Sequence, residues 1–212
     1  KTLNFMKLIK CVLLLLAIGF FLACEIKSEY SKLLKNELES GKSYEELFLG
    51  MEMGQTKDDF YKICADLNKK KLITSGARNL YPEYILYPKD RVEKGKKIRM
   101  SFMGIFNDDR IMRGMDVRFN YFTWVDWKKE YHSDHLIKEI KDTLLLWYPG
   151  NDFIEIDLKL DPKYKFAYVK VDGNRQITVY KIDARDVPKI MLLLTELYKM
   201  LQQIKDVKFD EK

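Results

Sequence analysis

The sequence is poor in cysteine and histidine, with 3 Cys and 2 His in 212 residues. Three cysteines cannot form the disulfide framework of a small secreted domain. Two histidines leave few residues for a metal site or a Ser–His–acid triad. No Gly-x-Ser-x-Gly motif occurs, and Gly41-Lys42-Ser43 lacks the upstream glycine and the apolar strand of a phosphate-binding loop. We therefore expect no cofactor and no bound metal, and an enzyme is the alternative hypothesis.

Glycine, proline and charge of one sign are also scarce, with 10 Gly, 5 Pro and a net charge of +6. The 47% hydrophobic and 33% charged content excludes collagen-like, low-complexity and wholly disordered chains. Lys1, Lys7 and Lys10 supply half of the excess charge, and without them the charge falls to +3. A net charge this close to zero gives little support for a nucleic-acid partner.

An uncharged run of 13 residues extends from Cys11 to Ala23, whereas a helix that spans a bilayer needs about 20. Basic residues before such a run and a small residue after it are typical of a secretory signal peptide. The stretch Phe21-Leu22-Ala23-Cys24 resembles a bacterial lipobox, with Phe21 where that family prefers Leu. This resemblance implies cleavage before Cys24 and lipidation of its thiol by palmitate-type chains. The alternative is a signal-anchor helix in which Cys24 has no such role.

The lipoprotein interpretation predicts the domain plan. Residues 1–23 form the signal peptide, 24–45 a tether with one short helix, and 46–212 a globular domain with possible lobes at 46–130 and 131–212. Glu25 stands where Asp would resemble an inner-membrane retention signal, so we expect the outer membrane, on either its periplasmic or its surface face. Of the three cysteines, only Cys64 lies in the expected globular domain. It falls on the apolar face of an expected helix, which predicts a small buried residue of the core.

Hydrophobic periodicity predicts helices and strands in alternating groups. Thr56 and Asp59 have capping-box-like spacing before an apolar face, so a helix begins at Thr56. We expect further helices at Asp134–Tyr148 and about 184–204. Strands are expected at Tyr84–Tyr87, Ile98–Phe106, Ile111–Phe122, Phe153–Leu158, Phe166–Val171 and Ile177–Ile182.

This order predicts an α+β fold, an antiparallel sheet with helices packed on one face. The helix starts at Thr56 and Asp134 lie 78 residues apart, which suggests a tandem helix-plus-three-strand pseudo-repeat. The turn Asn107-Asp108-Asp109-Arg110 is expected between two of the strands, and Asp172-Gly173-Asn174 between two others.

The stretch Gly54-Gln55-Thr56-Lys57-Asp58-Asp59 resembles the start of the small outer-membrane assembly lipoproteins of the SmpA/OmlA (BamE-like) type, with Gln55 in the Met place. Those proteins share a helix-plus-antiparallel-sheet architecture with the β-lactamase inhibitor proteins, which have it in tandem. The whole chain resembles uncharacterised lipoproteins of Bacteroidetes, through its lipobox, its aromatic content and the hairpin at residues 169–175. That group implies no particular activity.

Aromatic residues are the candidates for a binding surface. Trp124 and Trp127 follow one expected strand, and Tyr84 and Tyr87 recur beside prolines. Exposed aromatic side chains recognise proteins or sugars; the alternative is that they fill the core, which is the expectation for Phe119 and Phe122.

His132 and His135 are weak candidates for metal ligands, since their spacing puts them on nearby sides of one turn. A solvated helix start is the favoured interpretation.

The sequence thus predicts a lipid-anchored cell-envelope protein that binds another protein or a glycan on its sheet face, without enzymatic activity. The alternatives are an envelope hydrolase and a purely structural component of envelope assembly. Exposed aromatic side chains on the sheet favour binding, whereas a deep cleft with converging carboxylates favours the enzyme.

Overall fold

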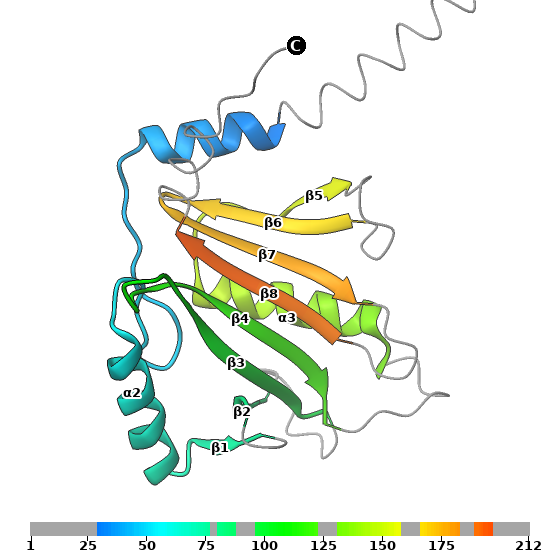
Figure 1. The fold of residues 1–212 in the computed structure, drawn as a ribbon. Coiled ribbons are helices and arrows are strands. Elements are labelled where there is room, and N and C mark those ends of the chain that lie inside the picture. The colour runs from blue at the N-terminus through cyan, green and yellow to red at the C-terminus, as the bar shows by residue number, and fades with distance from the viewer. Residues whose placement is uncertain are drawn as a thin grey trace, which may run out of the picture.

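The α+β class is confirmed by a single antiparallel sheet of eight strands, in the order β1-β2-β3-β4-β8-β7-β6-β5 (Figure 1). The computed structural model describes residues 29–76, 80–87, 96–122, 131–157, 166–182 and 189–196. The signal peptide, Cys24, Trp124 and Trp127 lie outside these ranges.

Most of the expected elements are present, with ends shifted by a few residues. A helix at residues 29–39 comes first. It is followed by α2 (Lys57–Lys69), β1 (Ile73–Ser75), β2 (Pro82–Leu86), β3 (Ile98–Phe106), β4 (Met112–Tyr121), α3 (Ser133–Trp147), β5 (Ile154–Asp157), β6 (Phe166–Asp172), β7 (Arg175–Ile182) and β8 (Lys189–Glu196). None of the helices in the described ranges has the length and hydropathy to cross a membrane.

The expected helix at about 184–204 is wrong, because residues 189–196 form β8 in the middle of the sheet. Leu192 pairs with Val117 of β4 on one side and with Val179 of β7 on the other. The continuous apolar run from Ile190 to Leu194 suits a strand inside a sheet as well as a helix face. Hydrogen bonding on both edges of the strand, which periodicity does not reveal, decides in favour of the strand.

With β8 as a strand, α2 and α3 are each followed by four strands in the described residues, and the two groups of strands join where β4 pairs with β8. The expected helix-plus-three-strand pseudo-repeat is therefore not confirmed in that form.

The start of α2 confirms the expected cap. Thr56 accepts a hydrogen bond from the Asp59 amide at 3.1 Å, and its hydroxyl donates to the Asp59 carboxylate at 2.6 Å. Just before it, the Gly54 amide donates to the Met112 carbonyl and the Met112 amide donates to the Gln55 carbonyl. The cap is thus fixed to the start of β4.

The main core lies between one face of the sheet and the helices α2 and α3. Phe60 and Cys64 from α2, and Leu136, Ile140 and Leu144 from α3, are buried against the strands. Cys64 is a buried free thiol, as predicted. Phe119 is 1% exposed, which confirms its expected place in the core.

A second, smaller core lies on the opposite face of the sheet. Ala167, Val169 and Val171 of β6 alternate with residues that face α3, and they pack against the 29–39 helix. The helix side chains in this core are Tyr30, Leu33, Leu34 and Leu38. The segment expected as a tether is therefore packed on the sheet, and the helices cover both faces of the sheet and not one.

The β6–β7 hairpin confirms the expected turn at Gly173, whose φ is +53°. Glycine at the first central residue of a two-residue turn is typical of a type II′ hairpin. A side chain at Gly173 would collide with the Lys42 carbonyl, so the hairpin tip lies directly against the segment after the first helix.

Candidate binding face

The β1–β4 half of the sheet has a second face that carries charged and aromatic side chains. Ile98, Met100 and Phe102 of β3 are buried in the main core, so the alternate residues Arg99 and Ser101 lie on the other side. The register places Ser101 between Glu83 and Arg118. We call this surface the open sheet face; it comprises Tyr81, Glu83, Ile85, Tyr87, Lys97, Arg99, Ser101, Asp116, Arg118, Asn120 and Phe122.

The β2–β4 end of this face carries exposed aromatic side chains. The 29–39 helix packs at the β6 end of the same side, far from β2 (Figure 1). At the β2–β4 end, by contrast, Tyr87 is 60% exposed and Phe122 is 52% exposed. Large side chains at this end therefore face solvent within the described part of the chain.

Charged groups of opposite sign are paired across the open sheet face. The Arg99 guanidinium lies 3.3 Å from the Glu83 carboxylate, and Ser101 donates a hydrogen bond to the same carboxylate at 3.4 Å. Arg118 donates to Asp116 at 2.9 Å, and this hydrogen bond raises the pKa of the Arg118 guanidinium. The pairs fix the positions of long side chains that would otherwise be mobile.

Each cation on this face also contacts an aromatic ring. The Arg118 guanidinium lies 4.8 Å from the Tyr81 ring and donates to its hydroxyl at 3.2 Å. Arg99 lies 4.8 Å from the Phe122 ring, and the Lys97 ammonium lies 5.7 Å from the Tyr87 ring. Such cation–π contacts contribute about 0.5–1 kcal/mol each at exposed sites. They hold the rings in defined orientations before any partner binds.

Two polar atoms of this face are buried without a hydrogen-bond partner in the described residues: Arg99 Nε and Asp116 Oδ1. Arg99 Nε is within ion-pair distance of Glu83 but lacks the geometry of a hydrogen bond. Buried polar groups normally have a partner. Both atoms are covered by the protein, so the rings and the outer charged atoms are the groups of this face that a partner can reach.

The predicted binding residues are divided between the two faces. Tyr87 lies at the end of the open sheet face, whereas Tyr84 lies on the other side and packs against the main core. Phe122, which was expected in the core, is half exposed and stacks on Arg99, so that expectation is wrong. Its place just beyond β4 puts it on the same face as Arg118. Trp124 and Trp127 lie outside the described residues.

The two histidines lie at the start of α3. His132 occupies the N-cap position without a side-chain capping bond, and His135 is exposed. In the parts of the chain that are described, no three or more His, Cys, Asp or Glu side chains converge on one point.

Sequence reasoning missed Arg99 and Arg118, each of which contacts both a carboxylate and an aromatic ring on the open sheet face. Both lie within strands that were expected, one position out of phase with the buried residues. The alternation of the strand pattern was therefore a signal that could have found them.

No known protein family, no curated protein and no solved structure matches this chain. Its function has to be inferred from the chemistry of its surface.

Proposed function

We propose that this protein is a non-enzymatic, lipid-anchored module of the cell envelope that binds a protein partner through its open sheet face. One observation carries the proposal: Arg118 and Arg99 are each stacked on an aromatic ring on an exposed sheet face. Tyrosine, tryptophan and arginine dominate the binding energy of protein interfaces. Rings that are already oriented lose little conformational entropy on binding.

The charges favour a protein partner over a glycan. Glu83 and Asp116 alternate with Arg99 and Arg118 on the face, so it presents both signs in a fixed pattern. Complementary charge patterns give specificity between proteins. A neutral glycan would use the rings but not this pattern, so glycan binding is one outcome that the experiment below has to separate.

The proposed lipid anchor is supported by the basic N-terminus, the short apolar run and Ala23-Cys24. Several acyl chains are needed for stable membrane attachment. The 29–39 helix, which follows Cys24 closely, packs on β6. An anchor at Cys24 would therefore hold the sheet near the outer membrane and not at the end of a long tether. The resemblance to small outer-membrane assembly lipoproteins supports an envelope role, although it identifies no partner.

A photo-crosslinking experiment tests the binding proposal. Benzoylphenylalanine placed at Tyr87 or Phe122, on the open sheet face, should give a discrete protein adduct in native envelopes. Tyr61, an exposed aromatic residue of α2, provides the matched control position. Arg118→Glu should abolish the adducts formed from the two face positions.

Two results would contradict the proposal: identical adducts from all three positions, or none from the face. If the adduct instead contains a glycan and persists in Arg118→Glu, the exposed aromatic side chains of the face bind a sugar.

The anchor is tested separately with labelled palmitate. Cys24→Ala should eliminate incorporation of the label and release the protein from the membrane fraction, whereas Cys64→Ala should change neither. Label that remains on the Cys24→Ala protein would show that the lipobox assignment is wrong.

A further inference from the structure

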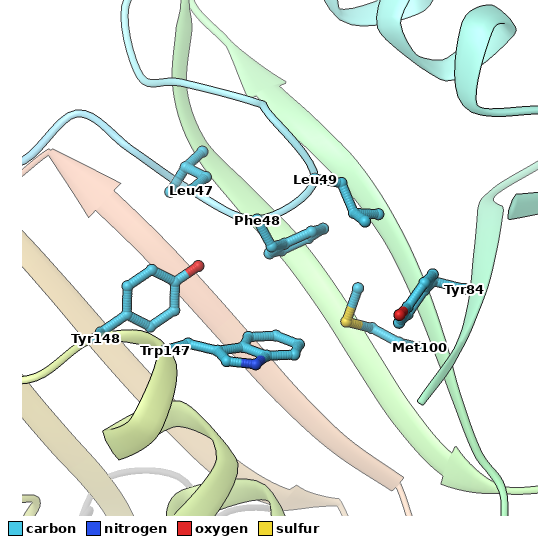
Figure 2. A pocket seen from close by; sticks show the side chains of 7 residues that line it. All are labelled: Leu47, Phe48, Leu49, Tyr84, Met100, Trp147 and Tyr148. Atoms are coloured by element: carbon cyan, nitrogen blue, oxygen red, sulfur yellow. The ribbon is translucent and has the colours of Figure 1, made fainter. Parts of the chain in front are cut away.

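A cavity of about 350 Å³ lies on the side of the sheet opposite to the open sheet face. Its walls come from three places: the turn at 47–49, the strands β2 and β3, and the end of α3 (Figure 2). The residues that line it are Leu47, Phe48, Leu49, Tyr84, Met100, Trp147 and Tyr148. Small-molecule sites occupy about 300 Å³ or more, so the cavity is at the lower end of that range.

The side chains that line the cavity are aliphatic or aromatic. The Phe48 and Trp147 rings pack against each other in its wall, with centroids 6.2 Å apart, and Met100 contributes an adaptable thioether. No side chain that lines the cavity is charged. Because this lining offers no opposite charge to an ion, the cavity favours an uncharged and mainly apolar occupant.

The Tyr148 hydroxyl is one of three polar side-chain groups in this lining, with the Tyr84 hydroxyl and the Trp147 indole N–H. Tyr148 is 4% exposed, and its hydroxyl has no hydrogen-bond partner among the described residues. Figure 2 shows the hydroxyl directed toward Leu47 and Phe48 on the opposite wall. A buried hydroxyl without a partner costs about 1–3 kcal/mol. A ligand oxygen that reached this hydroxyl from the cavity would remove that cost.

Two neighbouring side chains fix the orientation of the Tyr148 ring and so the direction of its hydroxyl. The Arg175 guanidinium lies 4.5 Å from the Tyr148 ring, and the Trp147 ring packs edge-on against it. Burial raises the pKa of Tyr148, so the phenol stays protonated and can donate a hydrogen bond. The complementary group on a ligand is therefore an acceptor.

The turn that closes the cavity is held in a strained conformation. Leu49 has φ +58°, in the left-handed region that non-glycine residues seldom adopt. Two backbone hydrogen bonds hold the turn, from Leu47 to Met51 and from Met51 to Phe48. Strain of this kind costs about 1–3 kcal/mol and is common at ligand clamps.

We propose that this cavity binds a small uncharged molecule, mainly hydrocarbon, whose carbonyl oxygen accepts a hydrogen bond from Tyr148. At ~30 Å³ per water-sized group, the cavity accommodates about a dozen non-hydrogen atoms. The site is separate from the open sheet face, so either proposal can fail while the other holds.

The experiment compares two ligands that differ in this oxygen. Benzylacetone carries one carbonyl, and butylbenzene is its hydrocarbon analogue. Both are titrated by calorimetry into the full-length chain, its Tyr148→Phe variant and the control Tyr121→Phe. Tyr121 is also buried, but its hydroxyl already donates to Glu139 at 3.1 Å, away from the cavity.

The wild-type chain should bind both ligands saturably. Tyr148→Phe should weaken benzylacetone by about 2- to 12-fold, the effect of one net hydrogen bond, and should leave butylbenzene unchanged. Tyr121→Phe should leave the affinity for both ligands unchanged. Absence of saturable binding, or an equal effect of Tyr148→Phe on both ligands, would overturn the proposal.

A second measurement locates the ligand independently of any variant. With carbon-labelled methionine methyl groups, benzylacetone should shift the NMR signal of Met100, which lines the cavity, and leave the signal of Met115, buried elsewhere in the core. A shift of Met115 without Met100 would place the ligand outside this cavity and contradict the assignment.

Discussion

The Lys170 ammonium lies 2.9 Å from the Asp172 carboxylate, and neither side chain reaches solvent. The same carboxylate accepts a hydrogen bond from the Asn151 amide at 2.9 Å and lies 3.6 Å from Arg175. Lys170 also donates to the Asn151 carbonyl. The β6–β7 hairpin is thereby joined to the chain just after α3, so the buried charges connect two parts of the fold.

The first prediction ranks two substitutions in this buried network. Asp172→Asn removes the carboxylate that lies between two buried cations and should cost about 3–5 kcal/mol in the free energy of unfolding. Lys170→Met should cost less, about 1–3 kcal/mol, because Asp172 keeps Arg175 and the Asn151 amide. Urea denaturation followed by circular dichroism measures both. Lys35→Met, in an exposed pair with Glu39, is the control and should change stability by less than about 1 kcal/mol. Equal losses for the two buried variants would contradict the ranking.

The second prediction concerns the pH dependence of the first helix. The Glu37 carboxylate accepts hydrogen bonds from the Gly173 amide and the Asn151 side chain, both at 2.7 Å. Chiefly because of the Gly173 bond, the pKa of Glu37 is lowered from its ordinary value of 4.5. A lowered pKa contributes stability at pH values above 4.5, and this contribution is lost as the pH falls through the value in the folded state.

Glu37→Gln should therefore flatten the acid limb of stability against pH, measured by urea denaturation from about pH 7 down to about pH 3. Glu39 lies two residues after Glu37 on the same helix, and its side chain is exposed. Glu39→Gln should therefore leave the acid limb as it is in the wild type. An unchanged acid limb in Glu37→Gln would show that this carboxylate does not link the helix to the hairpin.

The parts of the fold that were predictable are those decided by neighbouring residues. Thr56 caps α2 by a hydrogen bond to Asp59, three residues away. Gly173 adopts the positive φ that the turn of the β6–β7 hairpin requires. The α3 helix follows from one apolar face. In these cases the local pattern and the tertiary structure agree, so the sequence alone was sufficient.

The rest depended on partners distant in the sequence. Residues 190–194 suit a helix or a buried strand, and only pairing with β4 and β7 decides between them. Lys170 and Asp172 look like solvated hairpin residues, yet both are buried. Glu37, which binds the hairpin tip, lies 136 residues before Gly173. On the candidate face, the strand alternation indicated which side Arg99 occupies, but its contact with Phe122 required the structure.

The third prediction concerns the reactivity of Cys64. Cys64 is 8% exposed, and burial raises the pKa of its thiol to about 11. At about pH 8 only about one thiol in a thousand is then ionised, so a disulfide reagent should label native Cys64 very slowly. In a Cys11→Ser, Cys24→Ser background the rate should rise steeply with urea as the core opens. Cys64→Ala in that background gives the blank. Rapid labelling of the native chain would show that α2 does not bury this thiol.

The fourth prediction measures the cap of α2. Thr56→Ala removes the acceptor of the Asp59 amide and the donor to the Asp59 carboxylate, and should cost about 1 kcal/mol, within the range of about 0.5–2 kcal/mol for N-cap residues. Thr56→Ser retains both hydrogen bonds and should stay within a few tenths of a kcal/mol of the wild type. Both values come from urea denaturation. Because the residues just before the cap also pair with the start of β4, the loss should appear in the cooperative transition of the whole sheet and not as local fraying. Equal losses for the serine and alanine variants would assign the effect to the methyl group and not to the cap.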